Sequence, residues 1–222
     1  MSTTSNLGFL GGTGIEGKGL ALRFAKAGVP VLIGSRSLER AQAVSGELNQ
    51  ELGSGLITGA DNREMISACE IIFLTVPFEQ AVTPIETYRD CFRPESILVD
   101  VTVPIQFVGG RPQLVRLTEG SGSQSLAKHL PEGVQLVGAF KTIPSHVLAD
   151  VHVPLDCDVF VCGDSQTAKA RVMEVIRAIP TVRPVDAGAL EAAATLERMT
   201  LLAVGINRRY KIKSARFRVV GL

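Results

Sequence analysis

The sequence predicts an α/β fold in which helices cover both faces of a doubly wound, mainly parallel sheet. Short apolar runs alternate along the chain with longer segments whose apolar residues recur at helical spacing. A glycine-rich turn at residues 11–17 joins the first apolar run to the first helical segment. The runs at 70–77 and 96–104 are continuously apolar and rich in β-branched residues, which is typical of central strands in a parallel sheet.

The first part of the chain predicts three strands that alternate with three helices. Gly28 follows the first helix and favours its end, and Asp61 is placed to cap the third helix at its N-terminus. The expected strands are residues 7–11, 30–34 and 55–60, and the expected helices are residues 18–28, 37–52 and 61–69.

The second part predicts the same alternation after an irregular stretch at residues 105–125, where glycines and serines accumulate. The expected strands are residues 134–140, 159–163 and 183–187, and the expected helices are residues 165–179 and 189–207. The piece that follows "TIPSHVLADVHVPLD" is short, so we expect a boundary near residue 150 and a small C-terminal α+β domain over residues 151–222.

The composition of the chain limits the partners, location and metal sites that we expect for it. The 23 basic and 22 acidic side chains nearly cancel, so net charge implies no nucleic-acid partner. The sequence has neither an apolar signal core behind a basic stretch nor an apolar run of membrane-spanning length, so we expect a cytoplasmic protein without a membrane partner. The four cysteines form no CxxC pair and the three histidines lack metal-ligand spacing, so no metal is expected.

The glycine turn reads Gly-Gly-Thr-Gly-Ile-Glu-Gly and matches G-x-G-x-x-G between a strand and a helix. Gly12 permits the tight turn, Gly14 lets the backbone approach a pyrophosphate, and Gly17 allows close packing of helix on strand. The hydroxyl of Thr13 can reach the same phosphate oxygens. Together with the start of the helix at Ile15 and Glu16, these residues predict a Rossmann-type dinucleotide site within residues 1–150.

The second strand ends in Gly34-Ser35-Arg36, where a carboxylate would hold the ribose of NAD. A guanidinium offers a planar set of donors to phosphate oxygens, so Arg36 favours the 2′-phosphate of NADP(H). Ser35 adds a donor, and Arg40 lies one helical turn further on. The alternative is that both arginines are ordinary surface cations.

Two central strands end in proline, at Val76-Pro77 and Val103-Pro104. A nicotinamide lies across the carboxyl ends of such strands, where the prolines could present a flat apolar wall. Prolines also end strands for purely structural reasons, so this pattern alone leaves both interpretations open.

The chain resembles the NADPH-dependent reductases of the deazaflavin coenzyme F420 over nearly its whole length, from residue 9 to residue 222. The segments that carry the resemblance are "FLGGTGIEGKGLALRFAKAG", "VLIGSR", "LTVPFEQA", "GAFKTIP", "VFVCGD", "RPVDAG", "NRRYK" and "VVGL". The resemblance implies hydride exchange between NADP(H) and F420, in a cleft that the C-terminal domain closes. It also implies a homodimer, and the apolar segment 201–206 would suit its interface or a small core equally well.

The resemblance assigns residues to both ligands. Thr13, Ser35, Arg36 and Arg40 match NADP-binding positions, Val76 and Pro77 match positions near the nicotinamide, and Val103 is expected beside them, while Pro104, Thr142, Ile143 and Pro144 are expected on the acceptor side. Lys141 stands where family members commonly carry histidine and is the candidate catalytic residue facing the acceptor. The alternative is a solvated loop lysine.

Two other functions also stay open, the first of them because of Lys141. One is NADPH-dependent reduction of a flavin, a quinone, a ferric chelate or an imine, and the other is a non-catalytic NADPH sensor. The tail at residues 208–218 holds six cations in eleven residues. It is interpreted as a strip for the acidic tail of F420, as an edge strand blunted by charge, or as a weak nucleic-acid patch.

Overall fold

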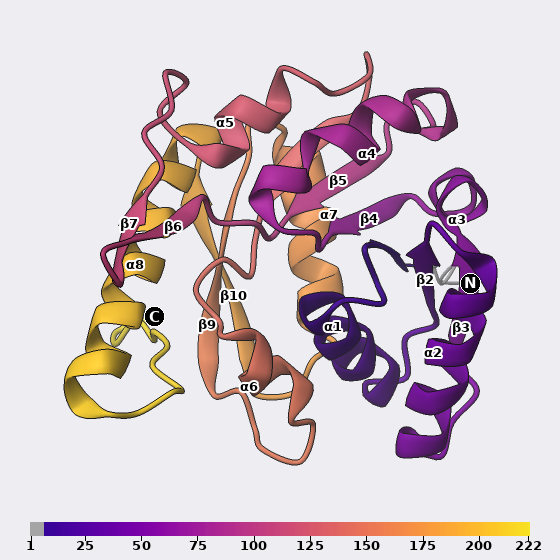
Figure 1. Cartoon of the computed structure of the whole chain (residues 1–222), viewed down its shortest axis with the longest axis horizontal. Coiled ribbons are helices and arrows are strands. Elements are labelled where there is room, and N and C mark those ends of the chain that lie inside the picture. Colours follow the sequence, from indigo (N-terminus) through magenta and orange to yellow (C-terminus); the bar gives the residue numbers. More distant parts are fainter. Residues whose placement is uncertain (1–6) are drawn as a thin grey trace.

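The computed structural model describes residues 7–222, so the first six residues, which bear on the expectation that no signal segment is present, lie outside the described residues. Its centre is an eight-stranded sheet in the order β10-β9-β8-β5-β4-β1-β2-β3 (Figure 1). Helices flank the sheet and confirm the predicted Rossmann-type α/β fold.

Six strands of this sheet are parallel and follow the predicted alternation with helices. They are β1 (Leu7–Leu10), β2 (Val31–Ser35), β3 (Ile57–Asp61), β4 (Ile71–Leu74), β5 (Ile97–Asp100) and β8 (Gln135–Gly138). The helices between the first five of these strands are α1 (Ile15–Lys26), α2 (Leu38–Leu52), α3 (Asn62–Ala68) and the short α4 (Val82–Thr87), which the sequence analysis does not predict. Because β1 is flanked by β2 and β4, the strand order reverses there, where α/β sheets bind ligands.

Local sequence signals explain the helix boundaries. The carboxylate of Asp61 accepts from the backbone N–H of Glu64, which confirms it as the N-cap of α3. The hydroxyl of Ser37 caps α2 by accepting from the N–H of Arg40, and Gly53 ends that helix in the left-handed conformation. These caps fix the entry of the chain into α2 and α3, directly behind the ends of β2 and β3.

The last two strands extend the same sheet. β9 (Cys157–Cys162) is antiparallel to β8, and β10 (Val182–Gly188) is parallel to β9. The helices of this part are α6 (Ser145–Ala149), α7 (Gln166–Ile176) and α8 (Ala193–Tyr210). The boundary near residue 150 stays a prediction, and the structure joins the strands on its two sides through one hydrogen-bonded sheet.

The stretch expected to be irregular contains a hairpin. β6 (Ile105–Val108) and β7 (Arg111–Leu114) pair as antiparallel strands and are followed by α5 (Gly122–Ala127). Gly109 and Gly110 turn the chain with φ of 55° and 72°, a conformation that a two-residue hairpin loop requires and that glycine adopts freely. Figure 1 shows this hairpin beside α8, far from α2 and β3.

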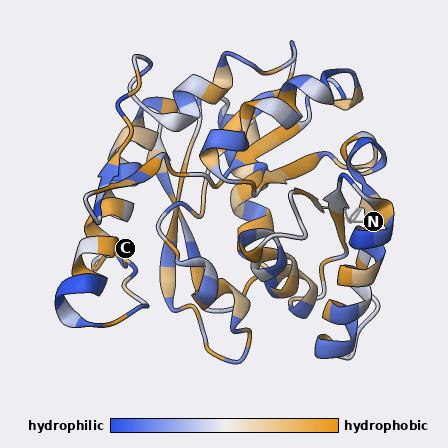
Figure 2. Ribbon diagram, in the orientation of Figure 1, coloured by the Kyte–Doolittle hydropathy of each residue, from blue (hydrophilic) through white to orange (hydrophobic). Residues whose placement is uncertain are grey.

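The core is aromatic at its centre. The rings of Phe9 and Phe73 stack with centroids 5.0 Å apart, and Phe140 meets Phe73 edge-on at 6.1 Å. Figure 2 shows hydrophobic residues concentrated on the central strands, whereas the end of α8 is hydrophilic. The buried cluster continues from Leu7 in β1 to Val182 in β10, so both parts of the chain share it.

Several shorter findings complete the fold. All four cysteines are buried and unpaired, which suits a chain stabilised by its core. Within residues 7–222 no helix is long and apolar enough to cross a membrane, and no three His, Cys, Asp or Glu side chains group as a metal site.

The segment 211–218 forms no strand, so the edge-strand interpretation of the tail is wrong. Instead Arg216 and Arg218 contact the oxygens of Leu155 and Asp156.

Candidate functional site: a dinucleotide pocket

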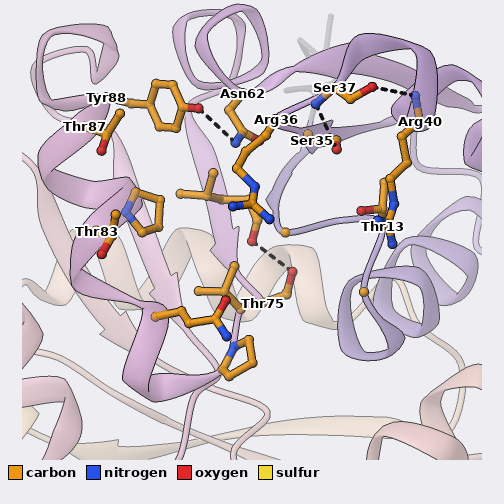
Figure 3. A pocket seen from close by; sticks show the side chains of 18 residues that line it. Thr13, Ser35, Arg36, Ser37, Arg40, Asn62, Thr75, Thr83, Thr87 and Tyr88 are labelled. Atoms are coloured by element: carbon orange, nitrogen blue, oxygen red, sulfur yellow. Dashed lines mark hydrogen bonds between the residues drawn. The ribbon is translucent and has the colours of Figure 1, made fainter.

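The main pocket lies at the carboxyl ends of β1, β2 and β4, where the strand order reverses (Figure 3). Its volume of about 640 Å³ is within the usual range of ligand sites. The lining residues are Leu10, Gly11, Thr13, Gly14, Gly34, Ser35, Arg36, Ser37, Arg40, Asn62, Thr75, Val76, Pro77, Gln80, Thr83, Pro84, Thr87 and Tyr88. The pocket therefore brings together seven residues that the sequence predicts, among them Thr13, Arg36 and Pro77.

Close packing explains two of the glycines. A Cβ on Gly17 would lie 2.6 Å from the Cα of Gly12, and a Cβ on Gly12 would lie 2.7 Å from the Cβ of Ile33. Neither position can hold a side chain unless the backbone shifts. Both glycines therefore shape the turn from behind and do not line the pocket.

Gly14 has a different part in the turn. It is the N-cap of α1, and no side chain caps the first turn of that helix. The backbone N–H groups at Ile15, Glu16 and Gly17 are thus at the open end of the helix, beside Thr13 and the pocket. Such an end binds phosphate through its N–H groups and the helix dipole, so this part of the pocket fits the pyrophosphate of a dinucleotide.

The predicted 2′-phosphate residues gather at the end of β2. Figure 3 shows the side chain of Arg36 extending across the pocket and that of Arg40 lying beside Thr13. Ser35 is the last residue of β2, and its hydroxyl accepts from the N–H of Ser37 at 3.3 Å. Two guanidinium groups and a hydroxyl at this strand end fit the phosphate of NADP(H) better than the two ribose hydroxyls of NAD.

The opposite wall follows β4. The hydroxyl of Thr75 donates to the carbonyl of Leu10 at 3.0 Å and ties the end of β4 to β1. Val76 and Pro77 come next and line the pocket, as the resemblance to the family implies. They place an apolar surface directly beside the phosphate-binding turn.

The sequence analysis missed the far end of the pocket. Asn62, the first residue of α3, donates from Nδ2 to the hydroxyl of Tyr88 at 3.4 Å (Figure 3). Thr83 and Thr87 of α4 line the same end. Asn62 could have been found because it directly follows β3, whereas the α4 residues could not, since the sequence analysis predicts no helix there.

Sequence comparison gives the family of the chain. A family model described as "NADP oxidoreductase coenzyme F420-dependent" matches residues 6–104. The F420-dependent NADP reductase of Methanothermobacter thermautotrophicus is 35% identical over 218 residues, which cover 96% of this chain and 94% of that relative. This chain belongs to the F420-dependent NADP reductase family. Its relative from Methanocaldococcus jannaschii is 32% identical and covers 97% of the chain.

Solved structures agree with this fold. A putative F420-dependent NADP reductase from Arthrobacter sp. FB24 matches with a TM-score of 0.80 and 19% identity over 97% of this chain and 99% of the other. A reductive aminase from Aspergillus terreus in complex with NADPH matches with a TM-score of 0.62 and 18% identity over 94% of this chain and 64% of the other. At these identities the two structures support the fold alone.

Lys141 lies in a different environment from the one that the sequence suggests. Its side chain is 0% exposed, and its ammonium lies 2.7 Å from the carboxylate of Asp100 and 2.6 Å from the carbonyl of Thr102. The solvated-loop alternative is therefore wrong. The acceptor-facing role stays a prediction, and an enclosed ammonium gives it no support.

The remaining acceptor-side residues lie outside the lining of the main pocket. Thr142 and Ile143 are 4% and 5% exposed, Pro104 is buried, and Val103 and Pro144 are half-buried. Their assignment to the nicotinamide and the acceptor stays a prediction from the family resemblance.

Glu16 is the one carboxylate within the glycine turn. Burial raises its pKa to about 8, because the ionised form loses hydration in the first turn of α1. A raised pKa favours the neutral carboxyl group, and the half-buried Glu16 then repels a nearby phosphate less than a carboxylate would.

Proposed function

We propose that this protein catalyses reversible hydride exchange between NADP(H) and the deazaflavin coenzyme F420. The observation that carries the proposal is the pocket at the end of β2, where Ser35, Arg36 and Arg40 take the place of a ribose-binding carboxylate. Membership of the F420-dependent NADP reductase family supplies the second substrate.

The pocket residues divide the binding of NADP(H) among them. The open N-terminus of α1, from Gly14, binds the pyrophosphate together with the hydroxyl of Thr13. Arg36 and Arg40 bind the 2′-phosphate with charge-assisted hydrogen bonds, and Ser35 adds a neutral donor. Because the phosphates bind at these two ends, the rest of the dinucleotide runs along the wall at Val76 and Pro77.

The chemistry requires orientation more than acid–base groups. When bound, the nicotinamide ring of NADP(H) supplies or accepts the hydride, and no side chain has to move a proton in that step. The contribution of the chain is to hold two flat rings at reacting distance and to keep water out. Val76, Pro77 and Val103 suit the nicotinamide side, and Pro104 with residues 142–144 suits the deazaflavin side.

The test is to mix purified protein, NADPH and oxidised F420 and to follow the visible absorbance of the deazaflavin. We expect the absorbance to fall and to return when F420H2 and NADP are mixed in the reverse assay. Oxidation of NADPH by FMN, a quinone, a ferric chelate or an imine, with none by F420, would instead identify a different acceptor. Tight NADPH binding with no turnover on any of them would indicate a sensor.

A homodimer remains the expected assembly. A groove of about 600 Å³ runs along α8, where Leu202 is 55% exposed between Arg198 and Arg209. An apolar strip of this kind suits contact with a second copy. Light scattering after gel filtration should give a mass near twice the 23.6 kDa of the chain, and a monomer mass would refute the proposal. The cytoplasm remains the expected location.

Residues 151–222 are expected to close the acceptor cleft. The support is the position of α8, whose Thr200 donates to the carbonyl of Lys141 at 2.8 Å, directly before the proposed deazaflavin-facing segment. The C-terminal part thus contacts the acceptor side of the site from outside the nucleotide pocket.

A further inference from the structure

A buried charged cluster lies at the carboxyl ends of β5 and β8, outside the lining of the nucleotide pocket. Its charged members are Asp100, Lys141 and Glu197, whose side chains are 0%, 0% and 3% exposed. One cation is thus enclosed with two carboxylates. We call this group the Lys141 cluster.

The ammonium of Lys141 connects two segments of the chain. Its Nζ lies 2.7 Å from Oδ2 of Asp100 at the end of β5 and 2.6 Å from the carbonyl oxygen of Thr102. The other oxygen of Asp100 accepts from the N–H and the hydroxyl of Thr102 at 2.8 and 2.7 Å. Lys141 and Asp100 together therefore fix the backbone at Thr102, directly before Val103-Pro104.

The same cluster reaches the N-terminus of α5. Ser123 donates from its hydroxyl to Oδ2 of Asp100 at 2.6 Å. Glu197 of α8 accepts from the N–H of Gly122 at 3.0 Å and lies 3.9 Å from the ammonium. A Cβ on Gly122 would lie 3.2 Å from Pro104, so α5 packs directly behind that proline.

The backbone before Lys141 is held just as firmly. Phe140 is 2% exposed within the aromatic core and has a φ of 57°, which is rare for a residue with a side chain. Thr200 of α8 binds the carbonyl of Lys141. The chain therefore enters the segment 142–144 from a conformation fixed on both sides.

These contacts have one geometric result. A single ammonium–carboxylate pair, Lys141 with Asp100, joins the backbone just before Val103-Pro104 to the backbone just before the segment 142–144. If one partner of such a buried pair is removed, the other is left as an uncompensated charge. Either water must then reach that charge or the backbone must move to expose it. The geometry is that of a support for the two segments, with no open face of the ammonium toward a ligand.

We propose that Lys141 is a positioning residue, which through Asp100 and Thr102 holds the wall at Val103-Pro104 at a fixed distance from the segment 142–144. The inference rests on the proposed function, because that function places the nicotinamide and the deazaflavin against these two segments. It assigns Lys141 an indirect part in hydride transfer, in place of contact with the acceptor.

The test uses Lys141→Met, which keeps the length of the side chain and removes its charge, and the neutral pair Asp100→Asn with Lys141→Met. In the single variant we expect kcat with F420 to fall at least 10-fold, while the Kd for NADPH stays within 2-fold. The neutral pair leaves no uncompensated charge on Asp100, so it should recover most of the lost stability, and kcat should recover only as far as hydrogen exchange in the two segments returns to its native rate. Lys128→Met, in an exposed pair with Glu119, is the matched control and should leave both values unchanged.

Amide hydrogen exchange gives a readout that does not depend on F420. Lys141→Met should accelerate exchange in residues 101–103 and 141–143 and leave β2 at the nucleotide pocket unchanged. This result would support the positioning role even if the wild-type protein failed to reduce F420. That failure would refute only the proposed function. If the single variant does not fold, the neutral pair carries the same measurements.

Two results would overturn the inference. One is unchanged kcat and unchanged exchange in Lys141→Met. The other is a neutral pair with native exchange in both segments and a kcat as low as that of the single variant, because the ammonium would then act on the acceptor itself.

Discussion

At the scale of single residues, Arg36 is the residue that we propose selects NADP(H) over NAD(H). Its position follows from the length of β2 and from the cap at Ser37, which turns the chain into α2 directly after the strand. The side chain extends across the pocket, and Arg40, which the sequence also predicts, lines the same pocket (Figure 3). The proposed selection of NADP(H) thus rests on a few adjacent positions.

Replacing Arg36 with Ala should weaken NADPH binding by about 1.5–3 kcal/mol, the usual contribution of a charge-assisted contact. NADH lacks the 2′-phosphate, so its affinity should change much less. Fluorescence titration with both cofactors measures the difference. Arg63→Ala removes an exposed arginine outside the pocket and is the control. Equal losses for NADPH and NADH would contradict the phosphate assignment.

Glu16 should make NADPH binding depend on pH. Its carboxyl group has a pKa raised to about 8, so it is neutral below that pH and negative above it. NADPH carries negative phosphates, and its affinity should therefore fall, by roughly 3- to 10-fold, as the pH rises from 7 to 9.5. Glu16→Gln should abolish this dependence in a titration series over that range.

The control for Glu16 is Glu47→Gln, which removes an exposed carboxylate on α2. It should keep the pH dependence of the wild-type protein. The same slope in Glu16→Gln and wild type would show that another group titrates.

At the scale of elements, the site depends on how closely α1 approaches β1. Gly17 has no room for a side chain, because a Cβ would lie 2.6 Å from Gly12 and 2.8 Å from the hydroxyl of Thr75. The helix thus brings its N-terminus directly to the ends of β1 and β4. If a side chain at this position pushed α1 away from β1, the helix would no longer present the same N–H groups to phosphate.

Gly17→Ala should therefore destabilise the protein by about 1–3 kcal/mol, as overpacking of a tight contact does. It should also weaken the binding of NADPH, because α1 has to move away from the turn. Urea unfolding and cofactor titration measure the two effects. Gly46→Ala, in α2 with no atom within 4 Å of the added Cβ, should be neutral or slightly stabilising. Unchanged stability of Gly17→Ala would refute the packing argument.

At the scale of the whole molecule, the basic tail closes the edge of β9 and β10. Asp158 is fully buried and accepts from the guanidinium of Arg183 at 2.9 Å and from the N–H of Val219 at 2.6 Å. That guanidinium holds the pKa of Asp158 below its usual range. Arg183 also donates to the carbonyl of Val219 at 2.7 Å. The tail therefore supplies hydrogen-bond partners to both members of the ion pair between Asp158 and Arg183.

Ending the chain after Ala215 should lower the free energy of unfolding by about 1–3 kcal/mol, because buried polar groups lose their partners. Denaturant unfolding measures this loss, and Val220→Ala, at a 97% exposed position, should show none. The Kd for NADPH should not change, since the tail lies outside the nucleotide pocket. Unchanged stability with weaker binding of F420 would instead favour the tail as a strip for the acidic F420 tail.

Much of the fold and seven of the eighteen pocket residues could be predicted because their signals are local. Apolar runs and caps such as Asp61 mark the elements, and the glycine turn with Ser35 and Arg36 occupies adjacent positions. The hairpin at Gly109-Gly110 carries a local signal too, but charged and polar neighbours obscured it. Tyr88 could not be predicted as a pocket residue, because its position depends on α4 folding back over Asn62.

Local sequence alone predicts the parallel sheet, the dinucleotide turn and the proposed phosphate site at the end of β2, because each depends on residues within one strand, turn and helix. Only the tertiary structure decided the environment of Lys141. Its partners Asp100 and Glu197 lie 41 and 56 positions away along the chain, and they meet the ammonium where β5, β8 and α8 pack together. Burial of a charge is a property of that packing, and no spacing in the sequence expresses it.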